Sequence, residues 1–317
     1  MATEESDSVL TARDFQSPQI NDWCAGCGDH GILRSLENAL AALRRSPDEV
    51  AVFGGIGCSG KTPYYLNSYG IHTLHGRLLP FAAGAKLSNP DLTVIAIGGD
   101  GDGLSIGAGH FVNAGRRNLD MTYILYNNGV YGLTKGQGSP TLRQGEQTKS
   151  MATSNLQAHV NPLLLALTAG FTWVGRGYAY DVKSLSQLIV EAVRHPGIAF
   201  LDVLQPCPVY NDLHTRGWYG ERIYSLQDED YDPLIADAGE EEGNRKKLEQ
   251  SLVRAQEWGE RIPLGIFLQD LTKPLFLEQI ADRQPGYMNT PPASRAIADD
   301  AGRTLADMRR LFAELEV

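Results

Sequence analysis

The sequence contains no long hydrophobic run, fewer basic than acidic residues and only four cysteines. No segment approaches the roughly 18 consecutive apolar residues that a membrane-spanning helix needs. The first residues, MATEESDSVL, carry acidic side chains where a secretory signal peptide carries basic ones. The 28 Lys and Arg against 38 Asp and Glu give a net charge of -10, which disfavours broad binding to nucleic-acid phosphates. These absences predict a cytoplasmic protein that binds neither membranes nor nucleic acids.

Short apolar runs alternate with helix-like segments over the first 225 residues. The expected strands are EVAVFGG, LTVIAIGGD, MTYILYNN, FTWVG and IAFLDVL, and DHGILRSLENALAAL has the apolar spacing of a helix after a candidate cap at Asp29. Strands that alternate with helices predict an α/β fold, a doubly wound and mainly parallel sheet over residues 1–225. From about Tyr224 the composition turns acidic, and residues 226–317 are expected to form a C-terminal extension that packs on this domain or on a partner subunit.

Two loops rich in oxygen ligands follow two of the expected strands. LTVIAI leads into Gly98-Gly99-Asp100-Gly101-Asp102, and MTYILY leads into Asn127-Asn128. At the carboxyl edge of a parallel sheet the glycines let backbone N–H groups approach a phosphate. Carboxylate, amide and carbonyl oxygens together with phosphate oxygens match the octahedral preference of Mg²⁺. Taken singly, either loop could be an ordinary glycine-rich or Asx turn that closes a strand.

The four cysteines are spaced as metal or redox ligands. Cys24 and Cys27 form a CxxC pair, Cys58 follows the strand AVFGG, and Cys207 follows the strand AFLDVL. Thiolates hold iron-sulfur clusters in sets of four, and these segments all reach the same predicted edge of the sheet. A structural Zn²⁺ site and inert free thiols are the alternatives.

Residues 55–62, GIGCSGKT, also match the phosphate-binding loop GxxxxGK[ST]. TVIAIGGD could then supply the acidic residue near Mg²⁺, which would make the protein a P-loop nucleotide hydrolase. Pro63 directly after Thr62 is an unhelpful start for the required helix, and this interpretation leaves the CxxC pair and Asn127-Asn128 without a role.

The GDG and NN segments resemble the fingerprint of thiamine-diphosphate enzymes, which implies that Val130 supplies its carbonyl as a third protein ligand of Mg²⁺, beside Asp100 and Asn128. A more specific resemblance, over about residues 15–225, is to the beta subunit of 2-oxoacid:ferredoxin oxidoreductases. It rests on six segments in the same order, DWCAGCGDHGIL, GIGCSGK, IHTLHGRLLPFAAGAKLSNP, GGDGDGLSIG, YNNGVYGLTKGQGSPT and QPCPVYN.

The resemblance implies one 4Fe-4S cluster on Cys24, Cys27, Cys58 and Cys207, close to thiamine diphosphate. It also implies a partner alpha subunit, in a heterodimer or a dimer of heterodimers, that contributes a second α/β domain and the glutamate for the aminopyrimidine of the cofactor. The expected reaction is the reversible, coenzyme A-dependent oxidative decarboxylation of a 2-oxoacid, with electrons passed to ferredoxin. The DWCAGCGDHGIL segment is most similar to 2-oxoglutarate members. The expected contacts with the cofactor are Gly57, Cys58, Ser59, His75, Gly99, Asp100, Gly101, Asp102, Asn128, Val130, Leu133 and Thr134.

Two residues are candidates for catalysis. Lys61 is three residues from Cys58 and is expected to bind the distal carboxylate of a 2-oxo diacid, with Leu133 shaping the apolar wall; a solvated lysine or a phosphate contact is the alternative. His75 is expected to donate to the diphosphate or to a developing alkoxide, or to be a structural histidine. Two other functions stay open, a thiamine-dependent decarboxylase without redox chemistry and a zinc-stabilised interaction subunit.

Overall fold

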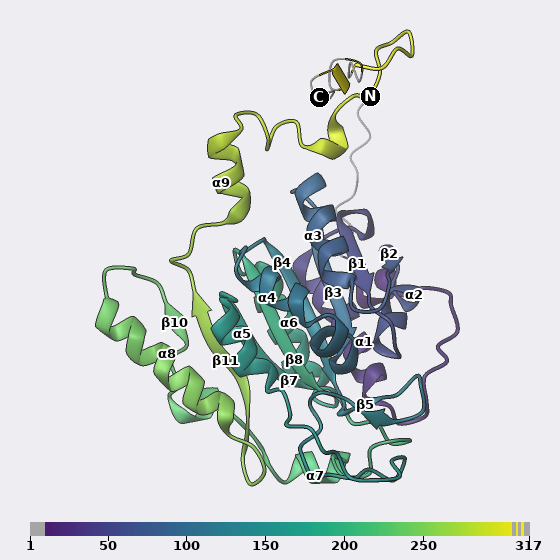
Figure 1. Cartoon of the computed structure of the whole chain (residues 1–317), viewed down its shortest axis with the longest axis vertical. Helices are drawn as coiled ribbons and strands as arrows, with labels where there is room; N and C mark the ends of the chain where they lie inside the picture. Colours follow the sequence, from purple (N-terminus) through teal and green to yellow (C-terminus); the bar gives the residue numbers. More distant parts are fainter. Residues whose placement is uncertain (1–9, 306–308, 310–311, 314–317) are drawn as a thin grey trace.

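The computed structural model describes residues 10–305, 309 and 312–313. In this part of the chain a nine-stranded sheet is covered by helices on both faces (Figure 1). From one edge to the other the strands are β10 (Leu234–Ile235), β11 (Ile262–Asp270), β7 (Trp173–Tyr178), β8 (Ile198–Leu204), β4 (Met121–Asn127), β3 (Thr93–Gly99), β1 (Val50–Gly54) and β2 (Tyr69–His72), and β9 (Ile223–Ser225) pairs with the beginning of β11. Neighbouring strands are parallel except for β11 and β7. The predicted doubly wound, mainly parallel fold is confirmed.

Helices bury apolar side chains on each face of the sheet. α1 (Gly28–Leu43) and α6 (Val182–Arg194) cover one face, and α3 (Leu78–Ser88), α4 (Ala108–Gly115) and α5 (Pro162–Ala169) cover the other. The remaining elements are α2 (Thr62–Tyr65), α7 (Arg216–Gly220), α8 (Glu241–Gln256), α9 (Phe276–Arg283), the hairpin β5 (Val130–Tyr131) and β6 (Gln137–Gly138), and short 3-10 or π-helical turns at Ala12–Phe15, Pro47–Glu49, Ser59–Lys61, Asp102–Ile106, Leu226–Glu229 and Pro292–Ser294. None of the described helices is long and apolar enough to cross a membrane.

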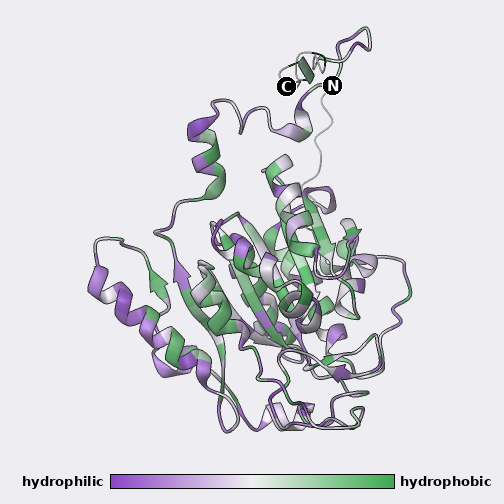
Figure 2. Ribbon diagram, viewed as in Figure 1, coloured by the Kyte–Doolittle hydropathy of each residue, from purple (hydrophilic) through white to green (hydrophobic). Residues whose placement is uncertain are grey.

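The strands are apolar on both sides because both faces are buried. In β1 the side chains of Val50 and Val52 pack with α1, whereas Ala51 and Phe53 pack with α3 on the opposite face. Figure 2 shows hydrophobic residues along the central strands and mostly hydrophilic residues along α8. Each large aliphatic side chain buried in this way contributes roughly 1.5–3 kcal/mol.

Helix α1 begins one residue earlier than its expected cap. Cys27 occupies the N-cap position in an extended conformation, and Asp29 lies within the first turn, so the prediction of an Asp29 cap is wrong. By contrast, Asp181 caps α6 by accepting a hydrogen bond from the Ser184 backbone N–H. The CxxC loop therefore leads directly into α1.

The chain beyond Tyr224 returns to the sheet before it leaves the domain. Strand β11 is antiparallel to β7, and α8 packs on α5 and β11. After α9, the Tyr287 hydroxyl donates to the Leu87 carbonyl at the end of α3, and Tyr287 and Leu277 are buried against the core. The expected border at residue 225 thus lies at the last residue of β9, between strands of one sheet.

Candidate active site

A cavity of about 270 Å³ opens at the carboxyl ends of β1, β3 and β4. It is formed by four chain segments, which follow β1, β2, β3 and β4. All twelve residues that the sequence predicts to contact the cofactor line this cavity: Gly57, Cys58, Ser59, His75, Gly99, Asp100, Gly101, Asp102, Asn128, Val130, Leu133 and Thr134. Ile56, Tyr131 and Gly132 complete the lining.

Asp100 is buried at the floor of this cavity, and its two oxygens have different surroundings. Oδ2 accepts hydrogen bonds from the Gly129 N–H at 2.9 Å, from the Ser139 hydroxyl at 2.6 Å and from the Thr141 hydroxyl. Within the described part of the chain, Oδ1 accepts only from the adjacent Gly101 N–H, at 2.9 Å. Burial raises the pKa of the Asp100 carboxyl, and these hydrogen bonds oppose the shift. A cation on Oδ1 would compensate the buried charge.

The two asparagines after β4 have separate roles. The Asn127 side chain turns into the protein and donates to Asp202 at 3.0 Å. Asn128 lines the cavity, and its Oδ1 accepts from the Val130 N–H at 2.9 Å. Asp100 and Asn128 therefore line one cavity, as two ligands of a shared metal ion would.

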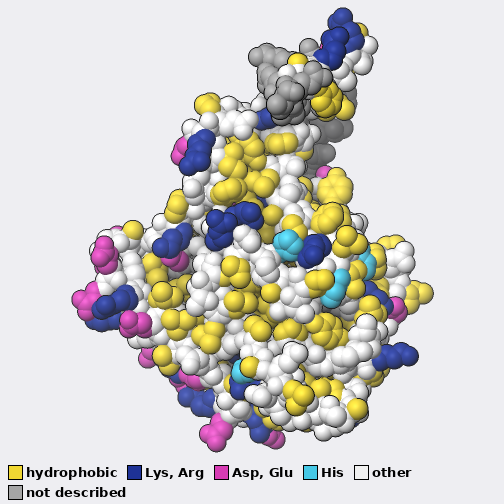
Figure 3. Space-filling model, in the orientation of Figure 1, with side chains coloured by type: hydrophobic (Ala, Val, Ile, Leu, Met, Phe, Trp, Pro, Cys, Tyr) yellow, Lys and Arg dark blue, Asp and Glu magenta, His cyan; other side chains and the backbone are white. Residues whose placement is uncertain are grey.

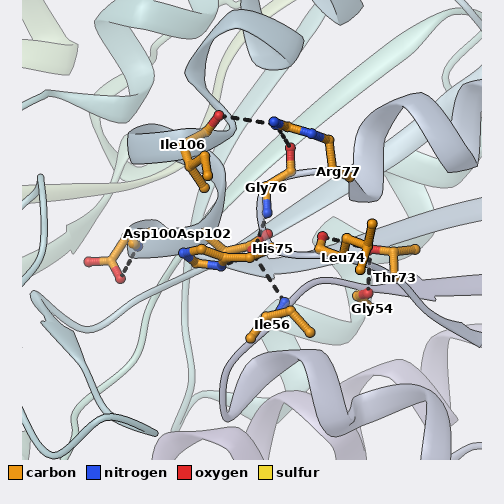
Figure 4. A network of polar contacts seen from close by, with 11 residues as sticks. Gly54, Ile56, Thr73, Leu74, His75, Gly76, Arg77, Asp100, Asp102 and Ile106 are labelled. Atoms are coloured by element: carbon orange, nitrogen blue, oxygen red, sulfur yellow. Dashed lines mark hydrogen bonds and ion pairs between the residues drawn. The ribbon is translucent and has the colours of Figure 1, made fainter.

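Asp102 connects three loops and holds His75. Its Oδ1 accepts from the backbone N–H of Ile56 at 3.0 Å, from the backbone N–H of Gly76 at 2.8 Å and from His75 Nδ1 at 2.7 Å. Figure 4 shows the imidazole reaching from the loop after β2 toward Asp100 and Asp102. Because Nδ1 is engaged by a carboxylate, it carries the proton in the neutral ring. Neutral His75 then offers Nε2 as an acceptor, and it donates from that nitrogen only when protonated.

Lys61 does not line the cavity. Its ammonium forms an ion pair with Asp22 at 2.8 Å, and Asp22 also accepts from the Tyr65 hydroxyl at 2.6 Å. The hydrogen bond with Asp22 raises the pKa of Lys61. A contact between Lys61 and a substrate stays a prediction.

The P-loop interpretation of residues 55–62 is wrong. The helix that follows the loop, α2, has only four residues, so it supplies no long helix to the loop. The Thr62 hydroxyl, which would bind Mg²⁺, is fully buried, where it donates to the Ser59 carbonyl at 2.7 Å and contacts the Tyr126 hydroxyl at 3.0 Å. Gly57, with φ of 143°, instead turns the chain into the wall of the cavity.

The loops that carry the cysteines are joined at the same edge of the sheet. The Trp23 indole N–H donates to the Cys58 carbonyl at 2.8 Å, and Trp23 packs with Cys27 and Cys58. The Gly28 N–H donates to the Pro206 carbonyl at 3.1 Å, which brings the Cys207 loop to the start of α1. These bonds join all three cysteine-bearing segments.

The thiols are near enough to influence one another. Burial raises the pKa of Cys27 and of Cys207, and it raises the pKa of Cys58 to about 11. Negative charge on Cys207 and Cys58 raises the pKa of Cys27 further, and charge on Cys207 and Cys24 does the same for Cys58. Among the described His, Cys, Asp and Glu side chains, no three are arranged to bind a single metal ion. A four-iron cube differs from such an ion because each cysteine binds a separate iron.

Cys58 is both one of the four cysteines and a residue of the cavity lining. A Cβ atom added to Gly132 would lie 3.3 Å from Cys58 Sγ, so the thiol faces the Gly132 position in the lining. Asp29 is buried beside the thiols, and neither of its carboxylate oxygens is hydrogen-bonded to a described residue. Burial raises its pKa to about 7. Asp29 was expected only as a helix cap, and Ser139, Thr141 and Gln205 were not singled out from the sequence at all.

A larger cavity, of about 860 Å³, lies at the opposite, amino-terminal ends of the strands. It is lined by the beginnings of β3 and β4 and by Lys86, Asp120 and Arg194. None of the residues singled out from the sequence lines it. The smaller cavity is therefore the candidate active site.

Two family models match consecutive parts of the chain. Residues 55–203 match the C-terminal TPP-binding domain of thiamine pyrophosphate enzymes, and residues 207–284 match the C-terminal region of pyruvate ferredoxin oxidoreductase beta chains. The 2-oxoacid:ferredoxin oxidoreductase subunit beta of Sulfolobus sp is 51% identical over 304 residues, which cover 95% of this chain and 98% of the relative. The chain belongs to this family of beta subunits.

Other members agree with this assignment. The 2-oxoglutarate oxidoreductase subunit KorB of Mycobacterium tuberculosis is 44% identical over 207 residues, 65% of this chain and 56% of that protein. A solved structure described as "2-oxoglutarate:ferredoxin oxidoreductase from Magnetococcus marinus with 2-oxoglutarate, coenzyme A and succinyl-CoA bound" superposes with a TM-score of 0.81 at 32% identity, covering 99% of this chain and 98% of that chain. The resemblance in the sequence is thus confirmed: this chain is a beta subunit of a 2-oxoacid:ferredoxin oxidoreductase.

Proposed function

We propose that this beta subunit binds thiamine diphosphate, Mg²⁺ and one 4Fe-4S cluster. Together with an alpha subunit it converts a 2-oxoacid and coenzyme A to an acyl-CoA and CO2, reversibly, with ferredoxin as the electron acceptor. The observation that carries the proposal is the position of Cys58. Cys58 lines the cavity together with Asn128 and Val130, and its sulfur faces the position of Gly132.

The cavity fits the diphosphate and its metal ion. Asp100, Asn128 and the Val130 carbonyl would hold Mg²⁺, since hard oxygen ligands are what this ion prefers. Gly99, Gly101, Ser59 and Thr134 line the space beside them. When bound, thiamine diphosphate supplies the electron sink for decarboxylation. The chain's own residues bind the diphosphate, hold His75 at the cavity wall and keep a thiol next to the reacting space.

The cysteine set fits a cluster better than it fits zinc. Cys24, Cys27, Cys58 and Cys207 are the four cysteines of the chain, and their segments are tied together by hydrogen bonds at one edge. The cluster would accept electrons one at a time, directly beside the cofactor cavity. Cysteines that bind a cluster must stay reduced, and thiols stay reduced in the cytoplasm. We therefore place the enzyme in the cytoplasm.

We propose 2-oxoglutarate as the acid. The names of the Mycobacterium and Magnetococcus relatives support this choice. Leu133 is half-exposed at the cavity and would form the apolar wall. Lys61 would leave Asp22 to bind the distal carboxylate. His75 would contact the cofactor or the substrate.

The alpha subunit would cover the face that carries α3 and α4. Figure 3 shows this face with many apolar, basic and His side chains, and with the acidic side chains at its periphery. Leu74, Phe81 and Ile106 are each at least half-exposed there. The extension that we assign to residues 226–317 would contribute through the segment after β11, which runs past α3.

The test is anaerobic co-purification of this chain with its alpha subunit. We expect a brown complex with about four irons and four sulfides per beta chain, which reduces ferredoxin when given 2-oxoglutarate and coenzyme A. Decarboxylation without ferredoxin reduction would indicate a thiamine enzyme without redox chemistry. A colourless protein with one zinc would indicate a zinc-stabilised interaction subunit.

A further inference from the structure

The side chain of Gln205 is hydrogen-bonded both to Cys27, one of the four cysteines, and to Asn128, which lines the cavity. Gln205 is the first residue after β8 and is 1% exposed. Its Nε2 donates to Cys27 Sγ at 3.2 Å and to the Pro206 carbonyl at 2.9 Å. Its Oε1 accepts from Asn128 Nδ2 at 2.7 Å. One buried amide thus joins a candidate cluster ligand to a candidate ligand of Mg²⁺.

The direction of this chain of hydrogen bonds is fixed by the backbone. The Val130 N–H can only donate, so the Asn128 atom that accepts it is the oxygen. Asn128 must then present its NH2 group to Gln205, which accepts through Oε1 and donates through Nε2. The Val130 N–H therefore determines the orientation of both amides in this series of hydrogen bonds. As a result Gln205 presents Nε2, and not Oε1, to Cys27 Sγ.

Packing holds Gln205 in this position. Its backbone N–H donates to the Asn127 carbonyl at 2.8 Å. A Cβ on Gly28 would lie 2.9 Å from Gln205 Cγ and 3.0 Å from Ala179 Cβ, so the side chain has little space in which to rotate. A buried amide with both ends hydrogen-bonded loses a bond in any other rotamer.

We propose that Gln205 is a positioning residue that couples the cluster to the thiamine site, an inference that rests on the proposed function. A hydrogen bond to a ligand sulfur stabilises the reduced, more negative cluster and so raises its reduction potential. The same side chain orients Asn128 with Oδ1 available to Mg²⁺, and outer-shell partners of this kind support metal affinity. Gln205 therefore acts on electron transfer through Cys27 and on cofactor binding through Asn128.

Two substitutions separate these effects. Gln205→Met removes all three side-chain hydrogen bonds, with Cys27, Asn128 and the Pro206 carbonyl, and keeps the length of the side chain. Gln205→Glu keeps an acceptor for Asn128 but, when ionised, removes the donor to Cys27 and to the Pro206 carbonyl. Tyr180→Phe is the matched control, because the Tyr180 hydroxyl donates to the Gly26 carbonyl in the CxxC loop and its hydrogen bonds include none to a sulfur.

The experiment uses the anaerobically purified alpha–beta complex of each variant. Iron content, the midpoint potential of the cluster from a redox titration followed by electron paramagnetic resonance, and the Kd of thiamine diphosphate with Mg²⁺ are measured. We expect Gln205→Met to lower the equilibrium constant for reduction of the cluster about tenfold, which lowers its midpoint potential by about 59 mV for one electron. Gln205→Glu should lower the potential by at least as much. Gln205→Met should also weaken cofactor binding about tenfold, whereas Gln205→Glu and Tyr180→Phe should bind the cofactor like the wild type.

The inference is overturned if the iron-loaded Gln205 variants have the wild-type potential, or if Tyr180→Phe shifts the potential as far as they do. It also fails if Gln205→Glu and Gln205→Met lose cofactor affinity equally. If Gln205→Met does not fold, Gln205→Glu still tests the contact with Cys27. Absence of iron from the wild-type complex is a different result, which would refute the proposed function itself.

Discussion

Asp102 holds the imidazole of His75 through a hydrogen bond of 2.7 Å from His75 Nδ1 to Oδ1. The same oxygen accepts hydrogen bonds from two backbone N–H groups, whereas Oδ2 is buried and has no hydrogen-bond partner among the described residues. A carboxylate with one saturated and one unpaired oxygen is costly to bury. Its position beside a cavity-lining histidine, with which it forms a hydrogen bond, indicates a role in orienting His75 in addition to joining the loops.

Replacing Asp102 by asparagine tests this role. In Asp102→Asn the amide oxygen can keep all three hydrogen bonds, and the new NH2 group takes the place of the unpaired oxygen. We expect the melting temperature of the complex to stay close to the wild type, and kcat to fall about tenfold because a neutral hydrogen bond holds His75 less firmly than a charged one.

The control is Asp102→Ala, which strands the N–H groups of Ile56 and Gly76. Each unpaired buried group costs about 1–3 kcal/mol, so this variant should melt at a lower temperature. Full activity of Asp102→Asn would show that Asp102 serves the fold alone.

Ser139 supports Asp100 and is not among the residues that line the cavity. Its hydroxyl donates to Asp100 Oδ2 at 2.6 Å, on the side away from the oxygen that we assign to Mg²⁺. Ser139→Ala should weaken the binding of thiamine diphosphate with Mg²⁺ by about 10- to 100-fold, as loss of outer-shell partners does at other metal sites. Titration of each complex with the cofactor measures the Kd, and Ser150→Ala, which removes a hydroxyl elsewhere in the same segment, is the control. Equal affinities in all three proteins would contradict the assignment of Asp100.

The predictable part of this molecule is the part with a repeating or spaced pattern. The central strands β1, β3, β4, β7 and β8 coincide with the short apolar runs, because strands buried on both faces are apolar throughout. The cavity lining likewise follows from glycine-rich turns at the ends of those strands. Strand β11 lies in the segment that the sequence predicts to be a C-terminal extension outside the sheet. Its sequence, IPLGIFLQD, follows a long acidic segment and pairs with a strand almost ninety residues earlier, so no local pattern places it in the sheet.

Other residues carry no pattern that a single sequence reveals. Ser139, Thr141 and Gln205 are ordinary polar residues whose importance comes from the buried oxygen or sulfur they contact. The GxxxxGK[ST] match misled for a related reason. The pattern does not encode the length of the following helix, and α2 ends after four residues.

Stability should decline in mild acid through His195. This residue is 2% exposed, and its Nε2 contacts the Thr172 hydroxyl at 2.8 Å. Nδ1 is buried, and no described residue forms a hydrogen bond with it. Burial lowers the pKa of His195 from 6.5 to about 4. The unfolded chain therefore binds a proton more readily, so this contribution is complete above pH 6.5 and is lost as the pH falls toward 4. The full effect is on the order of 3 kcal/mol.

Urea unfolding at pH 7.5 and pH 4.5 measures this loss. His195→Gln cannot be protonated, so its free energy of unfolding should fall less between the two pH values than that of the wild type. The same decline in both proteins would place the acid sensitivity elsewhere.

Lys61→Met tests the predicted substrate contact. The Lys61–Asp22 pair is partly exposed, so its loss should change the free energy of unfolding by no more than about 1 kcal/mol. If Lys61 binds the distal carboxylate, KM should rise at least tenfold for 2-oxoglutarate and little for pyruvate. Steady-state kinetics with both acids decide, and Asp22→Asn, which releases Lys61 without removing it, is the control. An equal effect on the two acids would exclude the contact.

Two truncations should separate folding from assembly. Ending the chain at Gln227 removes β11 and leaves the edge of β7 uncovered, so this protein should unfold or aggregate. Ending it at Arg283 retains every strand of the sheet and removes Tyr287, which contacts α3. Size-exclusion chromatography with the alpha subunit should show a folded beta chain whose affinity for alpha is reduced. Wild-type affinity after the second cut would show that the last segment has no part in assembly.

The central claim is that a magnesium–diphosphate site and a four-thiolate cluster share one edge of the sheet. An anaerobic crystal structure of the alpha–beta complex with thiamine diphosphate, with anomalous data collected at the iron edge, tests it most directly. The account predicts four iron peaks among the sulfurs of Cys24, Cys27, Cys58 and Cys207, and a metal ion bound by Asp100 and Asn128. Iron absent from the cysteines, or a cofactor bound away from Asp100, would contradict it.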